Sequence, residues 1–549
     1  MTAQTKRRSL FDAPALDSRI RSANTQKSEG WLGYFFGPCF ISMVYYAVAG
    51  SYLTQFYTDV LGLAGGLLTL MPFFSKIVDA ITNIAMGRII DRTRTKQGKA
   101  RPWILLSGIL IAAAGIMLYA VPKADVKVQL VWIVVSYNLF FAFAYTIYNM
   151  SHCLMVPLST RNTKQRDKLA MLTSTGTTMI PGLLVTIIMP IMINSFGVGA
   201  DAQGTWIKMM SIISILAIPA TLLEYYFTRE RVTEDAMAAE KGAAQTISFA
   251  QQFKACFADK YWLLVLAFNL MFQVINYLST NSMLYYSNWV MSDSVAGGTA
   301  KQVLINAIGQ APLGLGIFVL WPLVGKFGKR RVIQVGFVIG TIGSLIVLFS
   351  PGNFGLVLVG LFIKSIGALP TYCMAALTAE AMDHIEWKNG YRADGFSAAV
   401  FSIVVTVSSG IGQSILLGGI SAFGYIAPAS NTQVIDQPAA MKMFFSICFV
   451  GVTAVGYLLG AVIMSFYDVE KNMPQISADI TARHKAEAEA RGEVYLSMEE
   501  RAAIEEAEQE EQAEIKRIEE LKAKCAKKDL DFAVEEARYQ AKLAAKKKK

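Results

Sequence analysis

Charged residues are scarce in this chain. Asp, Glu, Lys and Arg make up 17% of its 549 residues, whereas hydrophobic residues make up 54%. A soluble protein carries about 25% charged residues, so this composition argues against a soluble enzyme. The six cysteines are scattered without paired spacing, which gives no support for a zinc site or a disulfide framework. The apolar stretches and their connections contain no HExxH, GxSxG or phosphate-binding glycine-rich motif. We therefore expect no enzymatic activity, no metal site and no cofactor.

Long apolar runs are abundant, and the mean hydropathy is +0.40. A bilayer core about 30 Å thick requires roughly 20 apolar residues per helix. We expect an all-α membrane protein with twelve transmembrane helices, at 31–57, 65–90, 102–121, 129–156, 170–195, 206–227, 261–291, 303–325, 332–350, 355–382, 396–424 and 441–466.

Basic residues alternate between the connections of these helices. The connections after helices 2, 4, 6, 8 and 10 hold twenty Lys and Arg residues, and the other connections hold at most five. Because positively charged loops remain in the cytoplasm, this asymmetry predicts a multi-pass protein of the cell membrane with both termini cytoplasmic. The lipid bilayer is the expected surrounding. We expect no nucleic-acid partner, since no basic stripe with interleaved aromatics lies on a soluble domain.

The connections after the second and eighth helices resemble each other. GRIIDRTRTKQGKARPW and VGKFGKRRVIQVG are both short, basic and glycine-containing. Two six-helix halves with a substrate site between them form the major facilitator fold. We therefore expect a cytoplasmic N-terminal segment (1–30), two halves (31–228 and 261–466), a central cytoplasmic loop (229–260) and a charged, partly helical cytoplasmic tail (467–549). In the tail, the capping-box spacing of Ser497 and Glu500 predicts the start of a helix.

Ionisable residues inside the predicted spans are candidate functional residues, because a charge at the bilayer centre costs roughly 2.5–3.5 kcal/mol on insertion scales. Lys76 and Asp79 lie three residues apart and Asn83 continues their helix face. They form either a structural ion pair or a site for a cation or a sugar hydroxyl, and these interpretations are compatible. Lys364 stands alone in helix 10, and its contact with Asp79 across the halves is a hypothesis. Glu224 lies near the end of helix 6, where we expect its side chain to reach the membrane surface.

Polar stripes at helical spacing occur in several spans from both halves. One stripe could simply join helices, but stripes from both halves predict a shared polar cavity. Amides and hydroxyls donate and accept hydrogen bonds as sugar hydroxyls do, and aromatic rings can lie against a sugar ring. His152 could also carry a proton, although a hydrogen-bonding role is more common for a lone histidine. Beyond the charged residues, the candidates for substrate binding are Tyr45, Asn149, His152, Asn269, Gln273, Asn276 and Thr406.

Four segments carry a resemblance to a known family. They are DRTRTKQGKARPWILLSG (91–108), YTDVLGL (57–63), KIVDAITNIAMGRIID (76–91) and AEAMDHIEWKNGYRADGFSAAVFS (379–402). With them, residues 30–466 resemble the glycoside–pentoside–hexuronide:cation symporters, which include melibiose permease. The resemblance implies cation-coupled sugar import by alternating access. It places Asp79, with Asn83 and Asn149, at the cation-coupling site, and Asp79 and Lys76 match residues of the family's second helix.

The chain departs from the family where the family carries charge. Asn83, Asn149 and Met43 stand where the family has carboxylates, and Thr406 stands where it has a lysine. The sugar-contacting arginine of the fifth helix is also missing. Sodium prefers several hard oxygen ligands, whereas a proton needs one titratable group. The departures therefore favour proton coupling over uniport and sodium coupling, and Lys364 could replace the missing lysine.

A cytoplasmic gate is expected where the basic connection after helix 2 meets the acidic connection after helix 10. Pairing between the halves would close this gate, while the alternative is that the basic residues serve topology alone. The candidates are Asp91, Arg92, Lys99, Arg101, Asp383, Glu386 and Arg392.

The leading hypothesis is a secondary active transporter that imports a glycoside, an oligosaccharide or a pentoside with a coupling cation. A sugar uniporter and a lipid or lysolipid carrier of the same fold are the alternatives within transport. A membrane sensor or scaffold acting through the charged tail is an alternative of another class.

Overall fold

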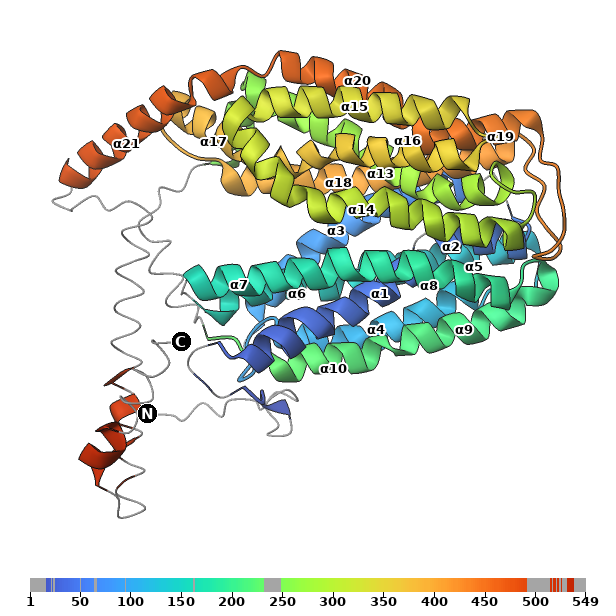
Figure 1. Ribbon diagram of the computed structural model, residues 1–549. Coiled ribbons are helices and arrows are strands. Elements are labelled where there is room, and N and C mark those ends of the chain that lie inside the picture. Colours follow the sequence, from blue (N-terminus) through green and yellow to red (C-terminus); the bar gives the residue numbers. More distant parts are fainter. Residues whose placement is uncertain are drawn as a thin grey trace.

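The computed structural model describes a helical bundle (Figure 1). The described residues are 16–20, 22, 25–49, 51–63, 67–93, 95–160, 163–231 and 248–490, with 514–515, 517–519, 521–522, 525 and 531–537 in the tail. Their regular structure is helical, and a single isolated bridge joins Thr95 to Gly98. The helix start predicted at Ser497 and Glu500 lies outside the described residues.

The N-terminal half contains six membrane-length segments, several of which are interrupted by short π-helical turns. They are η3 (Glu29–Phe36) with α1 (Gly37–Ala49), α2 (Ser51–Gln55) and η4 (Phe56–Val60); α3 (Leu67–Arg92); α4 (Arg101–Tyr119); α5 (Val126–Asn138) with η5 (Leu139–Tyr145) and α6 (Thr146–Ser159); α7 (Thr163–Ser174) with η6 (Thr175–Met179) and α8 (Ile180–Phe196); and α9 (Gln203–Ile215) with α10 (Ala217–Phe227).

The C-terminal half has the same number of long segments, and shorter helices flank it. The long segments are α13 (Lys260–Trp289), α14 (Val295–Phe327), α15 (Lys329–Phe349), α16 (Phe354–Ala368) with η8 (Leu369–Cys373) and α17 (Met374–Asn389), α18 (Asp394–Ala422), and α19 (Ala439–Ser446) with η9 (Ile447–Gly451) and α20 (Val452–Ser465). The flanking helices are α12 (Phe249–Phe257), which lies in the predicted central loop, and α21 (Met473–Ala490), which opens the tail.

These segments are helical because a backbone in lipid must satisfy its own hydrogen bonds. Eleven of the described segments are long and apolar enough to cross a membrane, and α14 occupies the position of the predicted eighth span. The prediction of an all-α membrane protein is confirmed, while the count of twelve spans stays a prediction. Side chains of N-cap residues stabilise the first turns of several helices. Asp259 accepts a hydrogen bond from the Trp262 backbone nitrogen at 2.9 Å, and Asn353 accepts one from the Leu356 backbone nitrogen at 3.2 Å.

The two halves lie closest at one end of the bundle. Figure 1 shows them near each other around α2, α5 and α19, and further apart toward α7, α10 and α17. We call these ends the α2 end and the α10 end.

Hydrogen bonds join the halves at the α2 end. The hydroxyls of Thr58 and Tyr285 lie 3.0 Å apart, and the Tyr425 hydroxyl donates to Asp59 Oδ1 at 2.8 Å. Trp289 Nε1 donates to the Tyr425 oxygen at 3.0 Å. Burial, with the nearby Asp59 carboxylate, raises the pKa of the Tyr425 phenol, so this phenol remains a neutral donor. The buried network closes the α2 end of the bundle.

In each half, a glutamate caps the helix that follows the basic loop, and these two loops are the ones that resemble each other in sequence. The Glu230 carboxylate, after α10, accepts hydrogen bonds from the backbone nitrogens of Lys99, Ala100 and Arg101 at 2.9–3.0 Å. In the second half, Glu470 follows α20 and accepts from the backbone nitrogens of residues 329 and 330 at 2.7 and 3.2 Å. Each carboxylate therefore caps the helix that follows a basic loop, since helix N-termini favour negative charge.

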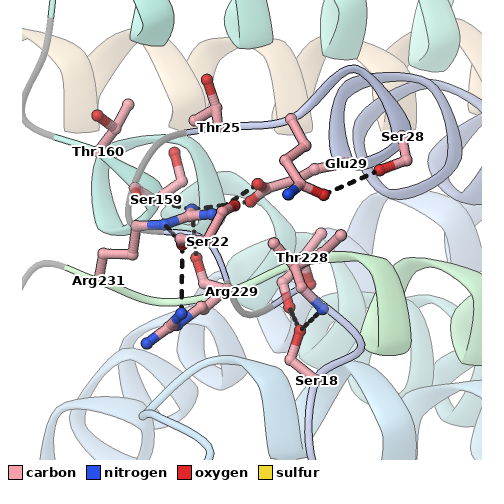
Figure 2. A network of polar contacts seen from close by, with 12 residues as sticks. Ser18, Ser22, Thr25, Ser28, Glu29, Ser159, Thr160, Thr228, Arg229 and Arg231 are labelled. Atoms are coloured by element: carbon pink, nitrogen blue, oxygen red, sulfur yellow. Dashed lines mark hydrogen bonds and ion pairs between the residues drawn. The ribbon is translucent and has the colours of Figure 1, made fainter. Parts of the chain in front are cut away.

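The residues after α10 are bound to the segment that precedes η3 (Figure 2). Arg231 and Glu29 form a two-bond ion pair at 2.9 and 2.7 Å, and Glu29 is 0% exposed. The Arg231 backbone nitrogen donates to the Leu158 carbonyl at 2.8 Å, and Ser18 Oγ donates to the Thr228 carbonyl at 2.8 Å. These contacts join η3 and the segment before it to the ends of α6 and α10.

Glycines bring α15 and α16 into close contact. A Cβ atom at position 343 would lie 2.3 Å from the backbone nitrogen of Lys364 and 2.6 Å from the Gly360 carbonyl oxygen. A Cβ atom at position 367 would lie 2.3 Å from the Gly340 Cα atom. Small residues at helix crossings allow such approach in membranes, and this crossing fixes the position of Lys364.

Replacing Gly343 with leucine should separate α15 from α16. Inserting side-chain atoms into a packed interface costs about 1–3 kcal/mol, so the melting temperature of the detergent-solubilised protein should fall. Gly204→Leu is the matched control, because a Cβ atom there would meet nothing within 4 Å. Equal melting temperatures for the two variants would contradict the close crossing.

Candidate substrate-binding site

The structure brings Lys76, Asp79 and Asn83 together on α3. Lys76 Nζ lies 3.7 Å from Asp79 Oδ2, and Asn83 Nδ2 donates to Asp79 Oδ1 at 3.0 Å. A residue from α6 joins them, because Thr146 Oγ1 donates to Asp79 Oδ1 at 2.8 Å. The side chains of Lys76 and Asp79 are 11% and 14% exposed. One cation and two hydrogen-bond donors therefore balance the charge of the Asp79 carboxylate.

This cluster lies where the two halves meet. α3 packs against α18 of the other half, and a Cβ atom at Gly410 would lie 3.0 Å from Lys76 Cγ and 3.0 Å from the Pro72 carbonyl oxygen. Glycine at this position allows the helices to approach. The Lys76 ammonium also lies 5.2 Å from the centre of the Phe141 ring. A charged group at this boundary is placed to respond when the halves move.

Tyr45 lies in a cluster of aromatic rings in the same half. Its ring stacks on Tyr145 with centroids 4.0 Å apart, and it meets Tyr46 and Phe141 edge-on at 5.7 and 6.1 Å. Such a cluster offers both ring faces and phenol groups to a ligand.

Lys364 is bound within its own half. Its Nζ donates to Ser279 Oγ on α13 at 3.2 Å and lies 5.0 Å from the centre of the Phe449 ring. Ser279 Oγ in turn donates to the Phe449 carbonyl at 2.6 Å. The hypothetical contact between Lys364 and Asp79 is not made, because each residue has partners in its own half.

The amide stripe on α13 is partly accessible. Asn276 is exposed and Gln273 is half-buried. The Asn269 side-chain oxygen is buried and has no hydrogen-bond partner in the described part of the chain. Thr406 is half-buried on α18, and its backbone carbonyl accepts a hydrogen bond from Ser409. These four predicted residues stay candidates for contact with a ligand.

Asn149 lies on α6, and no hydrogen bond joins it to Asp79 in the described part of the chain, so its place at the coupling site stays a prediction. It is exposed on α6, where its Oδ1 accepts from Cys153 Sγ at 3.9 Å. Thr146, one helical turn earlier, contacts Asp79 instead. The sequence contained this signal, because Thr146 lies three residues before Asn149 on a similar helix face.

Glu224 does not reach the membrane surface, and the sequence-based expectation for it was wrong. It is 1% exposed, and its carboxylate accepts a hydrogen bond from the Tyr148 hydroxyl at 2.7 Å and lies 2.7 Å from His152 Nδ1. The reason is that other helices cover α10 at this point: a Cβ atom at Gly37 of α1 would lie 2.8 Å from Glu224 Cβ. His152, expected among the sugar-binding residues, is therefore bound to α10.

The predicted gate residues of the first half lie at the α10 end. Arg101 donates to the Tyr225 carbonyl at 2.8 Å and to Gln97 Oε1 at 3.0 Å. Arg92 is exposed at the end of α3, and the Lys99 backbone binds Glu230. The Asp91 side chain lies outside what the structure describes.

The predicted gate residues of the second half also contact one another. Arg392 donates to Asp383 at 2.5 Å and to Glu386 at 3.1 Å, and His484 of α21 lies 2.7 Å from Glu386. Arg101 thus binds partners in the first half and Arg392 binds partners in the second, and pairing between the halves stays a prediction for another conformation.

A family model described as MFS/sugar transport protein matches residues 33–471. The chain belongs to this family. The major facilitator fold and a transporter function, as opposed to an enzymatic one, are thereby confirmed.

Curated relatives of this family member cover most of its length. The isoprimeverose transporter of Lactiplantibacillus pentosus is 25% identical over 446 residues, which are 80% of this chain and 89% of the relative. The inner membrane symporter YicJ of Escherichia coli is 24% identical over 425 residues, covering 76% and 86%. The glucuronide carrier protein homolog of the same organism is 23% identical over 449 residues, covering 80% and 93%.

Solved structures share the fold at low sequence identity. A bacterial homologue of the human lysosomal transporter Spinster, in an inward-facing and unoccupied conformation, is 14% identical with a TM-score of 0.53, covering 80% of this chain and 98% of that one. A mutant of the peptide transporter POT is 13% identical with a TM-score of 0.51, covering 84% and 97%. At such identities the likeness supports the fold and not the substrate.

Proposed function

We propose that this protein is a symporter that imports a glycoside, an oligosaccharide or a pentoside across the cell membrane. The observation that carries the proposal is the Lys76–Asp79 pair, which is largely buried in a membrane-spanning helix beside the opposite half. Ionisable groups inside membranes mark substrate or ion sites by default, because they are costly to place there. The relatives support a sugar as cargo, since one is named an isoprimeverose transporter.

Sugar recognition would use groups that both donate and accept hydrogen bonds. Asp79 would accept from a sugar hydroxyl and Lys76 would donate to one, while Tyr45 and Tyr145 would lie against the C–H face of the sugar ring. From the other half, the amides of Asn269, Gln273 and Asn276, with Thr406 and Lys364, would reach the ligand as the halves close.

Alternating access would use the two ends of the bundle in turn. The α2 end is held closed by the contact of Tyr425 with Asp59, and we propose that the α10 end faces the cytoplasm. The described conformation is then open inward. When the protein opens outward, basic gate residues such as Arg92 and Lys99 would pair with acidic ones such as Asp383 and Glu386.

The coupling ion is proposed to be a proton. Sodium requires several oxygen ligands with charge to offset its dehydration. Asp79 Oδ1 already accepts two hydrogen bonds, and Asn83 and Thr146 act toward it as donors. This arrangement supports sodium coupling poorly, whereas a proton needs only one titratable group.

The test is a pulse of isoprimeverose onto de-energised cells that express the protein. Uptake with alkalinisation of sodium-free external medium is the expected result. Uptake with no pH or sodium response would show that the protein is a uniporter and not a symporter. Failure of both isoprimeverose and a glucuronide to enter would contradict the sugar assignment, and lysolipids would be tested next.

A further inference from the structure

The pair formed by Glu224 and His152 is a buried titratable site separate from the Lys76–Asp79 cluster. Glu224 is 1% exposed and His152 is 6% exposed. Their contact joins α10 to α6 over 2.7 Å, and the Tyr148 hydroxyl donates to the other carboxylate oxygen. A buried carboxylate is costly unless it is paired with an opposite charge.

Among the residues that the structure describes, the groups placed against Glu224 carry no permanent positive charge. They are Tyr148, His152 and Cys153 of α6 and Tyr34 of η3. α1 contributes the backbone at Gly37, and α4 approaches α10 through Gly108 at Thr221.

Two arginines near this site have other partners. Arg101 binds the Tyr225 carbonyl and Gln97, and Arg231 binds Glu29. Among the described neighbours of Glu224, His152 is therefore the group that can become positive near neutral pH.

The geometry leaves one nitrogen of His152 available for a proton. With Nδ1–H donating to Glu224, the second ring nitrogen, Nε2, is an acceptor. Nε2 is buried and has no hydrogen-bond partner among the described residues. Binding one proton there forms an N–H bond and an imidazolium ion, and changes the net charge of the pair from −1 to zero.

We propose that His152 and Glu224 bind the coupling proton, with Nε2 as the acceptor and the carboxylate as the balancing charge. This inference rests on the proposed symport function. It differs from the family-based expectation, which placed coupling at Asp79, Asn83 and Asn149. The Asp79 carboxylate is already balanced by Lys76, so its charge does not require a proton.

A row of neighbouring aromatic rings connects the site to the proposed sugar site. The His152 ring stacks on Tyr148 with centroids 5.4 Å apart, Tyr148 lies 6.1 Å from Tyr145, and Tyr145 stacks on Tyr45. A change in charge at His152 alters its attraction to Glu224 and so the fit of α6 against α10. This change would shift Tyr145 and Tyr45, where the sugar is proposed to bind.

The first test measures protonation without any sugar. The chain has three histidines, so full-length protein labelled at histidine and placed in lipid nanodiscs gives three imidazole NMR signals. His152→Gln identifies the signal of interest. We expect this signal to change to that of a protonated ring when the pH is lowered, and we expect Glu224→Gln to weaken this proton binding, because the substitution removes the balancing carboxylate.

Asp259→Asn is the matched control for this titration. Asp259 Oδ2 lies 2.5 Å from His384 Nδ1 in a separate histidine–carboxylate pair, so the control should move the His384 signal alone. A His152 ring in wild-type protein that stays neutral over the whole pH range of the titration would overturn the proposal. So would a midpoint that is unchanged by Glu224→Gln.

The second test uses proteoliposomes with isoprimeverose as probe. Glu224→Gln and His152→Gln should reduce proton-driven accumulation at least about tenfold, equivalent to about 1.4 kcal/mol, and Glu224→Gln should retain exchange of internal for external sugar. Variants that accumulate sugar like wild-type protein would refute the proton site while the symport function stands. If wild-type protein moves no sugar, the proposed function fails, and the NMR titration alone decides whether the site binds a proton.

Discussion

Replacing Asp79 with asparagine is expected to reduce strongly both accumulation and exchange of isoprimeverose. The substitution removes the proposed acceptor of a sugar hydroxyl and deprives Lys76 of its charged partner. Truncating one member of a hydrogen-bonded buried charge pair costs about 2 kcal/mol or more, which corresponds to an apparent affinity about 30-fold weaker or more. Exchange in proteoliposomes measures this loss directly, because it requires no ion gradient.

Asp125→Asn is the control for this prediction. Asp125 is exposed before α5, and its side chain makes no capping hydrogen bond there. Undiminished exchange in Asp79→Asn would contradict a role for the pair in sugar binding. Loss of accumulation with normal exchange would instead indicate that the coupling site lies on α3. That second pattern is the one expected of Glu224→Gln, so the two variants separate binding from coupling.

Replacing Glu29 with glutamine should strongly destabilise the protein. Glu29 is fully buried and forms two hydrogen bonds with Arg231, so its replacement leaves the arginine charge without its partner. Breaking a buried ion pair in this way costs about 3–5 kcal/mol. We expect a clear drop in the melting temperature of the detergent-solubilised protein and lower expression.

Asp468→Asn is the comparison for a pair at the surface. Lys260 and Asp468 lie 3.7 Å apart, and their side chains are 60% and 51% exposed. An exposed pair is worth about 0–1 kcal/mol, so this variant should melt close to wild type. The double variant Glu29→Met with Arg231→Met should recover stability relative to Glu29→Gln. Equal melting temperatures for Glu29→Gln and Asp468→Asn would show that the Glu29 pair contributes little.

The sequence predicted local features of the candidate site well. Lys76, Asp79 and Asn83 were expected on one face because helical spacing alone places residues three and four apart beside each other, and the structure brings them together. The sequence could not predict the partners of Lys364 or Glu224. Lys364 binds Ser279, 85 residues away, and Glu224 binds His152, 72 residues away. No local periodicity encodes such contacts.

Sequence by itself determined that this protein is a helical membrane transporter. The length of the apolar runs and their lack of charge depend only on the order of residues along the chain. In a bilayer, such runs form transmembrane helices. Tertiary structure decided which ionisable groups are covered. Glu224 lies near the end of an apolar segment, where its side chain could have reached water, but the packing of α1 and α6 against α10 encloses it beside His152. The environment of a charge depends on neighbours that are distant in sequence, and so the proposed proton site became visible only in the folded chain.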